Sequence, residues 1–291
     1  MTAAASTTAE IRAALAGVRA LLLDMDGVLV LRGKLIPGAD EALAQLDGLG
    51  IPWVIVTNVS LQSRASLARD LAAAGLPIRA DRIVTASSAS AGYVKRRFGD
   101  RPLFVMAKPD ALTEFEGLNL LSWEAAAASG AAAAAVVVGD ASEDFTARNM
   151  QSAFALLRGG ARFIAMHKNR WWITPAGVMM DSGAYVAALE FATQRRALVT
   201  GKPSPAFFGE GRLRLAELAG GSELPPEKVA MVGDDLWNDI RGAQKAGLRG
   251  IFVRSGKHGD AELARLGAER GHPAPDAIAA SIVEIAAALA S

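Results

Sequence analysis

The sequence predicts an α/β fold built on a doubly wound parallel sheet, with a second α/β domain inserted into it. Two observations predict this fold. Short, almost wholly apolar runs recur along the chain, and polar residues follow each of them. Helical patterns with one apolar face fill the intervals between the runs. Such runs are typical of strands buried on both faces, and their alternation with helices is typical of a parallel α/β sheet.

Four apolar runs are the expected strands of the main sheet. They cover residues 18–23, 52–56, 197–199 and 229–232. The polar residues that follow them are, in order, Asp24-Met25-Asp26-Gly27, Thr57-Asn58, Thr200-Gly201-Lys202 and Gly233-Asp234-Asp235.

Helices are expected between these strands. Residues 39–49 carry leucines and alanines on one face, and Ser63 is a plausible N-cap for a helix that Gly75 stops. A further helix is lined by Ile240 and stopped by Gly247. The apolar residues expected to mark the last helix are Ile278, Ile282, Ile285 and Leu289.

Residues 87–196 predict a separate domain. Apolar runs at 103–106, 134–138 and 163–166 alternate there with helical patterns, which is enough for a compact α/β unit. We therefore expect a core domain made of residues 17–86 and 197–291, interrupted by this insertion.

Composition excludes several classes of function. Basic and acidic residues number 31 and 30, so the net charge of +1 leaves no basic footprint for nucleic acid. The chain has no cysteine, which excludes disulfides, thiolate metal sites and cysteine nucleophiles. Neither a signal peptide nor an apolar run of the ~20 residues that span a bilayer is evident, so we expect a cytoplasmic protein with no membrane partner.

The polar strand ends predict chemistry. Ligands of open parallel sheets bind at the carboxyl ends of the strands, so these residues should meet in one crevice. Carboxylates, an ammonium and a hydroxyl indicate Mg²⁺ together with a phosphoryl group, because Mg²⁺ prefers oxygen ligands and often shares its site with phosphate. The residues expected there are Asp24, Asp26, Thr57, Asn58, Lys202, Asp234, Asp235 and Asp239.

Each residue type suits a step of phosphoryl transfer. Of the two carboxylates after the first strand, one can attack phosphorus and the other can protonate the leaving oxygen. Thr57 can donate its hydroxyl to the phosphoryl oxygens, and Lys202 can offset their negative charge. Asp234 would complete the metal site, and Asp239 would orient a metal-bound water.

These motifs resemble those of the haloacid dehalogenase-like hydrolases. The resemblance is carried by DMDGVLV (24–30), VIVTN (54–58), GKPSP (201–205) and VGDDLWNDIRGAQKAG (232–247), and the insertion looks like the type-two cap of that superfamily. The text LIPGADEAL and GKPSPAFF resembles the nitrophenyl phosphatase and nucleotide phosphatase branch. The segments GARFIAMHKNRWW and YVAALEFAT are similar to those of phospholysine phosphohistidine inorganic pyrophosphate phosphatases.

The resemblance implies specific roles. It implies Asp24 as the nucleophile, Asp26 as the acid and base, and phosphate held by Thr57, Asn58 and Lys202. It implies Mg²⁺ held by Asp24, the backbone carbonyl of Asp26 and Asp234. It also implies a cap that forms a homodimer.

The segment from His167 to Trp171 follows an expected strand of the insertion. It is either a loop that binds the leaving group of the substrate or a surface loop that contacts a second subunit. In the last part of the chain, His258 within RSGKHGD is expected to be a surface histidine.

Three functions fit this sequence. The first is a phosphatase that acts on small-molecule phosphate monoesters, with phosphoamino or pyrophosphate substrates as variants of it. The second is a phosphotransferase or mutase on the same scaffold. The third is a non-enzymatic phospho-receiver module, which the long insertion before Lys202 disfavours.

Overall fold

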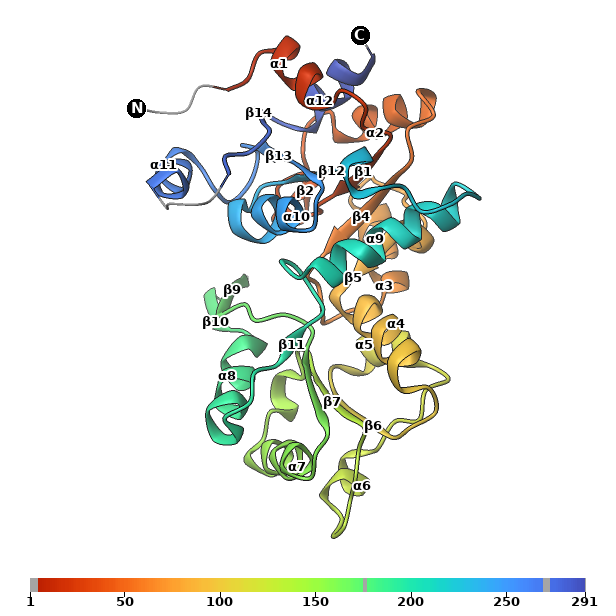
Figure 1. The fold of residues 1–291 in the computed structure, drawn as a ribbon, viewed down its shortest axis with the longest axis vertical. Helices are drawn as coiled ribbons and strands as arrows, with labels where there is room; N and C mark the ends of the chain where they lie inside the picture. The colour runs from red at the N-terminus through yellow and green to blue at the C-terminus, as the bar shows by residue number, and fades with distance from the viewer. Residues whose placement is uncertain (1–4, 175–176, 269–272, 291) are drawn as a thin grey trace. The chain divides into compact units, whose positions relative to one another are not determined.

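The computed structural model describes residues 5–174, 177–268 and 273–290, which form two compact units (Figure 1). The first unit draws on the segments up to Thr57, from Leu67 to Val84, and from Lys202 onward. The second takes in Asn58–Ser66 and Thr85–Gly201. The boundaries expected from the sequence, at 86 and 197, stay a prediction.

Residues 58–66 group with the second unit because of their polar contacts. The Ser63 hydroxyl donates a hydrogen bond to Asp110 Oδ1 over 3.0 Å, and the Ser66 hydroxyl donates to the same oxygen over 2.8 Å. Arg64 pairs with Glu114 at 2.9 Å.

The first unit contains a six-stranded sheet in the order β14-β13-β12-β1-β4-β5. Its strands are β1 (Ala20–Leu23), β4 (Trp53–Thr57), β5 (Ile83–Thr85), β12 (Val229–Gly233), β13 (Arg249–Val253) and β14 (Ala277–Ala279). β1 pairs in parallel with β4 on one side and with β12 on the other. The chain therefore builds outward from β1 first in one direction and then in the other, which confirms the doubly wound α/β prediction.

Helices cover both faces of this sheet, and its central strands are therefore buried along their whole length. Figure 1 shows α1, α2 and α12 on one side of the sheet and α9 and α10 on the other. Gly211 of α9 has no side chain to separate that helix from the sheet: a Cβ there would lie 2.9 Å from the side chain of Leu22 and 3.2 Å from that of Val56. The helices of this unit are α1 (Thr8–Ala14), α2 (Ala39–Gly48), α3 (Arg64–Ala73) from Leu67 onward, α9 (Pro205–Leu218), α10 (Gly242–Lys245), α11 (Asp260–Ala268) and α12 (Ile282–Ala290).

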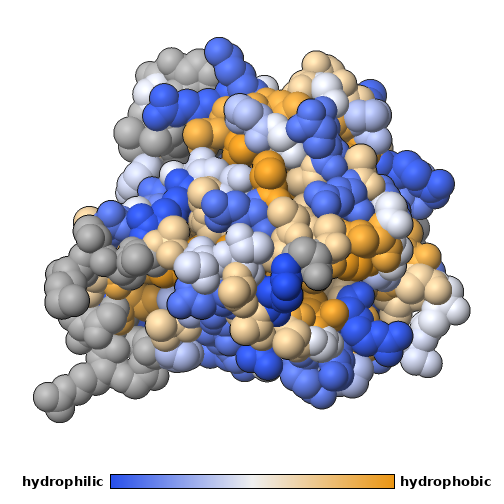
Figure 2. All heavy atoms as spheres, turned by 90° about the horizontal axis from the view of Figure 1, so that it is seen from above, coloured by the Kyte–Doolittle hydropathy of each residue, from blue (hydrophilic) through white to orange (hydrophobic). Residues whose placement is uncertain are grey.

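The surface of the first unit mixes residue types. Figure 2 shows hydrophilic and hydrophobic residues interspersed over the face seen from above, which is ordinary for a protein surface. Large apolar side chains that remain exposed include Leu49 after α2 and Val283 on α12. Within the described parts of the chain, every helix is too short or too polar to cross a bilayer.

The second unit is built on a four-stranded parallel sheet in the order β11-β8-β7-β6. Its strands are β6 (Leu103–Met106), β7 (Ala135–Val138), β8 (Arg162–Ala165) and β11 (Leu198–Val199), with a hairpin of β9 (Trp171–Thr174) and β10 (Gly177–Met180). Its helices are α4 (Ala86–Phe98), α5 (Pro109–Leu112), α6 (Trp123–Ala127), α7 (Ala147–Arg158) and α8 (Ser182–Thr193). This unit supplies the second α/β sheet that the sequence predicts.

Two expected elements were wrong. The run at 197–199 was expected in the core sheet, but β11 pairs with β8 through Leu198 and Ile164 in the second unit. A run this short carries no pattern that says which sheet it joins. Ile278 was expected in the last helix, but it lies in β14 opposite Phe252, and the helix begins at Ile282. Ile278 and Ile282 are four residues apart, which is also the spacing of residues on one face of a helix.

Candidate active site

Three polar groups lie at the carboxyl edge of the first sheet because of its register. Leu23 of β1 is level with Ile55 of β4 and with Val232 of β12. Asp24 follows Leu23 directly, while Thr57 and Asp234 each stand two residues beyond the partner of Leu23. All three side chains are buried. Parallel pairing therefore brings together residues that are distant in the sequence.

Asp24 is held by its backbone and by its carboxyl group. Its N–H donates to Val232 O over 2.8 Å and thereby continues the ladder between β1 and β12. Its Oδ1 accepts the N–H of Met25 at 2.8 Å and lies 2.7 Å from Lys202 Nζ. These contacts fix the orientation of the carboxyl.

Lys202 joins Asp24 to Asp239. Its ammonium lies 2.6 Å from Asp239 Oδ1, and Asp239 Oδ2 accepts the N–H of Asp235 over 3.0 Å. Asp239 stands on the π-helix Leu236–Arg241, directly after β12 and the two aspartates that follow it. Both its oxygens are thus occupied by groups of the protein.

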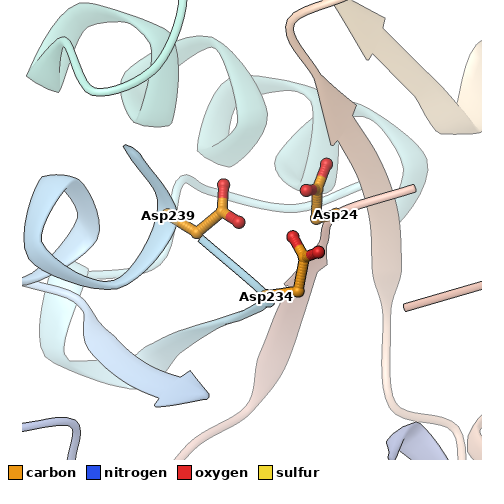
Figure 3. A group of neighbouring side chains, drawn as sticks. All are labelled: Asp24, Asp234 and Asp239. Carbon is orange, nitrogen blue, oxygen red and sulfur yellow. The ribbon is translucent and has the colours of Figure 1, made fainter. Parts of the chain in front are cut away.

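Three carboxyl groups converge in this place. One oxygen from each of Asp24, Asp234 and Asp239 lies within 4.8 Å of the others, and Figure 3 shows them facing a common space. Three carboxylates with one ammonium leave two negative charges to be balanced. A divalent cation with a preference for oxygen ligands would balance them.

The pKa values of these groups reflect the burial of like charges. Burial and the charge of Asp234 raise the pKa of Asp24 to about 6, although Lys202 opposes the shift. Burial and Asp239 raise the pKa of Asp234 to about 7, and burial and Asp24 raise the pKa of Asp239 to about 8. Burial alone would lower the pKa of Lys202, but the two carboxylates that it touches raise it.

Asp235 is adjacent to Asp234 in sequence but differs from it electrostatically. Its Oδ1 accepts the N–H groups of Trp237 and Asn238 at 3.0 and 2.9 Å, which caps the π-helix. Its Oδ2 lies 3.0 Å from Lys257 Nζ. Burial would raise the pKa of Asp235, yet Lys257 and the capping N–H groups lower it to about 2. Asp235 therefore orders the loop as a carboxylate that is ionised near neutral pH.

Asp26 and Asn58 lie beside the buried cluster in sequence but outside it. The side chain of Asp26 is exposed, and the chain around it still excludes enough water to raise the pKa of its carboxyl, against the attraction of Lys202. Within the described residues, the side chain of Asp26 is not part of the group of converging carboxylates. Asn58 belongs to the second unit, where its Oδ1 lies close to Gly201.

The two residues expected to bind the leaving group differ in exposure. His167, in the second unit, is 2% exposed, and its Nε2 lies 2.8 Å from the Ser60 hydroxyl. Trp171, in the hairpin of the same unit, is 54% exposed. Trp171 is therefore free to meet a ligand, whereas His167 is enclosed by protein.

Sequence reasoning missed the contribution of the loop after β13. His258 was expected at the surface, but it is half-buried, and its Nδ1 accepts the N–H of Leu236 over 3.0 Å. The N–H of Lys257 donates to Asp234 Oδ2 over 2.5 Å. The pair of glycines around Lys257 and His258 was the signal available in the sequence, because glycine often marks close backbone approach to a site.

Comparison with known proteins agrees with this geometry. Family models described as haloacid dehalogenase-like hydrolase and HAD-hydrolase-like match residues 21–120 and 199–285. Haloacid dehalogenase-like hydrolase domain-containing protein 2 of Bos taurus is 34% identical over 258 residues, which cover 89% of this chain and 90% of that protein.

Two named phosphatases are also similar to the chain. Human phospholysine phosphohistidine inorganic pyrophosphate phosphatase is 35% identical over 84% of this chain and 85% of its own length. The crystal structure of a 4-nitrophenylphosphatase from Thermotoga maritima matches with a TM-score of 0.81 and 30% identity, and covers 95% of this chain and 99% of that one.

Replacement of Lys202 by methionine should destabilise the metal-free protein in a pH-dependent way. The change leaves Asp24 and Asp239 buried without their cation, which typically costs about 3–5 kcal/mol. As the pH falls, the carboxylates take up protons and the loss should shrink. We expect a larger decrease in the free energy of unfolding at pH 8.5 than at pH 5.5, measured by urea titration in EDTA.

The control is Lys245→Met, because Lys245 is exposed on α10. Its effect should stay within about 0.5 kcal/mol at both pH values. An equal loss for Lys202→Met at the two pH values would contradict the electrostatic explanation.

Proposed function

Because the chain belongs to the haloacid dehalogenase-like hydrolases, we propose that it is a Mg²⁺-dependent phosphatase that acts on small-molecule phosphate monoesters. The observation that carries the proposal is the convergence of Asp24, Asp234 and Asp239, two of which, Asp24 and Asp239, also contact the ammonium of Lys202. The similarity to proteins named as phosphatases supports it.

The cluster fits Mg²⁺. Its donors are carboxylate oxygens, its net charge is negative, and its burial makes an uncompensated charge costly. Asp24 and Asp234 would hold the ion with the backbone carbonyl of Asp26. Asp239 would not be a ligand but would act on the site through its contact with Lys202. When bound, Mg²⁺ would polarise the phosphoryl oxygens and offset their charge.

The residues of the chain divide the reaction into two steps. Asp24 attacks phosphorus and forms an aspartyl-phosphate as the bond to the leaving oxygen breaks, and Asp26 gives that oxygen its proton. A water molecule then attacks the same phosphorus and gives its proton to Asp26. Inorganic phosphate leaves, and the carboxylate of Asp24 is restored. Thr57, Asn58 and Lys202 bind the phosphoryl group throughout.

Replacement of Asp24 by asparagine tests the nucleophile. We expect turnover of p-nitrophenyl phosphate to fall about 10³-fold or more, because an amide does not form the covalent intermediate. The circular dichroism spectrum should stay that of the wild type. Asp40→Asn, an exposed position on α2, is the control and should keep full activity. Activity of the Asp24 variant within tenfold of wild type would remove Asp24 from this role.

Stabilisation by Mg²⁺ should increase with pH. The raised pKa values of Asp24, Asp234 and Asp239, about 6, 7 and 8, mean that protons compete with the metal below pH 8. We expect the rise in Tm caused by 10 mM Mg²⁺, as against EDTA, to be several degrees larger at pH 8.5 than at pH 5.5.

The matched variant for this experiment is Asp234→Asn, which should lose the Mg²⁺-dependent rise in Tm. Asp40→Asn should retain it. A rise in Tm that is the same at both pH values, or that survives in Asp234→Asn, would refute the proposed ligand set.

Substrate preference is proposed to depend on the hairpin of the second unit. Trp171 offers an exposed aromatic face, and His167 contributes by fixing Ser60. We expect Trp171→Ala to change the ratios of kcat/KM across phosphoamino acids, pyrophosphate, nucleotides and sugar phosphates by about tenfold. Trp171→Phe should largely preserve them. Phe191→Ala, at an 81% exposed position on α8, is the control. Ratios that do not change in Trp171→Ala would exclude Trp171 as the selector.

A homodimer through the second unit stays a prediction. The exposed Trp171, Met179 and Met180 of the hairpin are compatible with it, and light scattering on the purified protein measures it directly.

A further inference from the structure

The loop between β13 and α11 contacts the site at several points, although none of the motifs that predicted the site includes it. It comprises Arg254, Ser255, Gly256, Lys257, His258 and Gly259. Its contacts reach the turn after β1, the carboxyl of Asp234 and the start of the π-helix.

The first contact is a direct hold on Asp234. The backbone N–H of Lys257 donates to Asp234 Oδ2 over 2.5 Å. The carboxyl is also confined by two glycines, because a Cβ on either Gly27 or Gly256 would overlap it. A Cβ on Gly27 would in addition lie 2.8 Å from the Cα of Gly256. Asp234 thus lies between two segments of backbone that approach each other only without side chains.

Three further bonds anchor the loop on both sides of this contact. The Ser255 hydroxyl donates to Gly27 O over 2.5 Å, which ties the loop to the turn that carries Asp26. Lys257 Nζ donates to Asp235 Oδ2 over 3.0 Å. His258 Nδ1 accepts the N–H of Leu236 over 3.0 Å, so its ring proton is on Nε2 in the neutral form.

We propose that this loop is a positioning element that sets the affinity of the site for Mg²⁺ by fixing the carboxyl of Asp234. The inference rests on the proposed function. With Oδ2 held by an N–H and the carboxyl enclosed by backbone on two sides, the carboxyl group of Asp234 keeps one orientation in the group that it forms with Asp24 and Asp239. Groups that orient a metal ligand in this way typically change metal affinity by 10–100-fold when they are removed.

The contacts of Asp235 extend the influence of the loop to the π-helix. Asp235 binds Lys257 with one oxygen and caps the π-helix of Asp239 with the other. The loop therefore couples the position of Asp234 to that of the helix on which Asp239 stands. A change in the Lys257 side chain should weaken Mg²⁺ binding without touching a metal ligand.

The test compares two glycines of the same loop. Gly256→Ala places a methyl group against the carboxyl of Asp234, whereas at Gly259 the nearest atom to a new Cβ is Glu262 Oε2 at 4.0 Å. We expect Gly256→Ala to raise the Mg²⁺ concentration at half-maximal rise in Tm about tenfold or more, in the absence of substrate. Gly259→Ala should match wild type.

Lys257→Met covers the case in which Gly256→Ala does not fold. It should raise the half-saturating Mg²⁺ concentration for the rise in Tm about fivefold or more. Lys257→Arg should keep an affinity for Mg²⁺ close to that of wild type, because it keeps a cation beside Asp235. A purely structural role would lower the Tm of the metal-free protein and leave the half-saturating concentration unchanged.

The possible failures are distinguishable. If wild type responds to Mg²⁺ and Lys257→Met and Gly256→Ala respond at the same concentrations, the inference is wrong and the proposed function stands. If the Tm of wild type does not respond to Mg²⁺ and activity survives EDTA, the proposed metal dependence fails and the inference falls with it.

Discussion

The buried contact of Lys202 with Asp24 and Asp239 is the interaction on which the rest of the site depends. The ammonium is 4% exposed and lies within 2.7 Å of an oxygen of each carboxylate. Carboxylates removed from water to this extent are costly unless a cation accompanies them. Lys202 supplies one positive charge for the whole cluster, so the cluster keeps a negative charge that favours a divalent ion. Burial, together with this residual charge, raises the pKa values of the carboxyl groups.

The adjacent residues Asp234 and Asp235 are chemically identical but differ in pKa, because their local contacts differ. Asp234 is buried and faces other carboxylates, and both effects raise its pKa to about 7. Asp235 faces Lys257 and two backbone N–H groups, and its pKa falls to about 2. The charge of Asp234 is left to be balanced from outside the protein, whereas the charge of Asp235 is balanced by Lys257. The loop after β13 serves both, since the N–H of Lys257 holds the first and its ammonium the second.

The second unit combines a regular sheet with a hairpin on which several of the described apolar side chains are exposed. Its sheet ends in buried polar residues, among them His167, which is bonded to Ser60 from the segment just after β4. Its hairpin presents Trp171, Met179 and Met180 to solvent. The buried residues order the unit internally, whereas these three side chains of the hairpin are accessible to solvent.

The sequence by itself determined the fold class and most of the residues brought together in the core. The apolar runs ending in Asp24, Thr57 and Asp234 predicted a doubly wound sheet with these residues at one edge, because parallel strands expose their carboxyl ends together. Lys202 followed from its motif, although the strand before it belongs to the second sheet. Local patterns carry such information, since burial on both faces constrains every residue of a strand.

Only the tertiary structure decided which sheet the short run before Lys202 joins, that Ile278 lies in a strand, and that His258 is a hydrogen-bond acceptor inside a loop. It also decided the opposite charge environments of Asp234 and Asp235. These properties depend on residues that are far away in the chain. Such residues set the strand register and the distances between carboxylates, and one of them supplies the backbone N–H of Lys257. A run of two residues or a single histidine has no periodicity that encodes its partner, so packing assigns it.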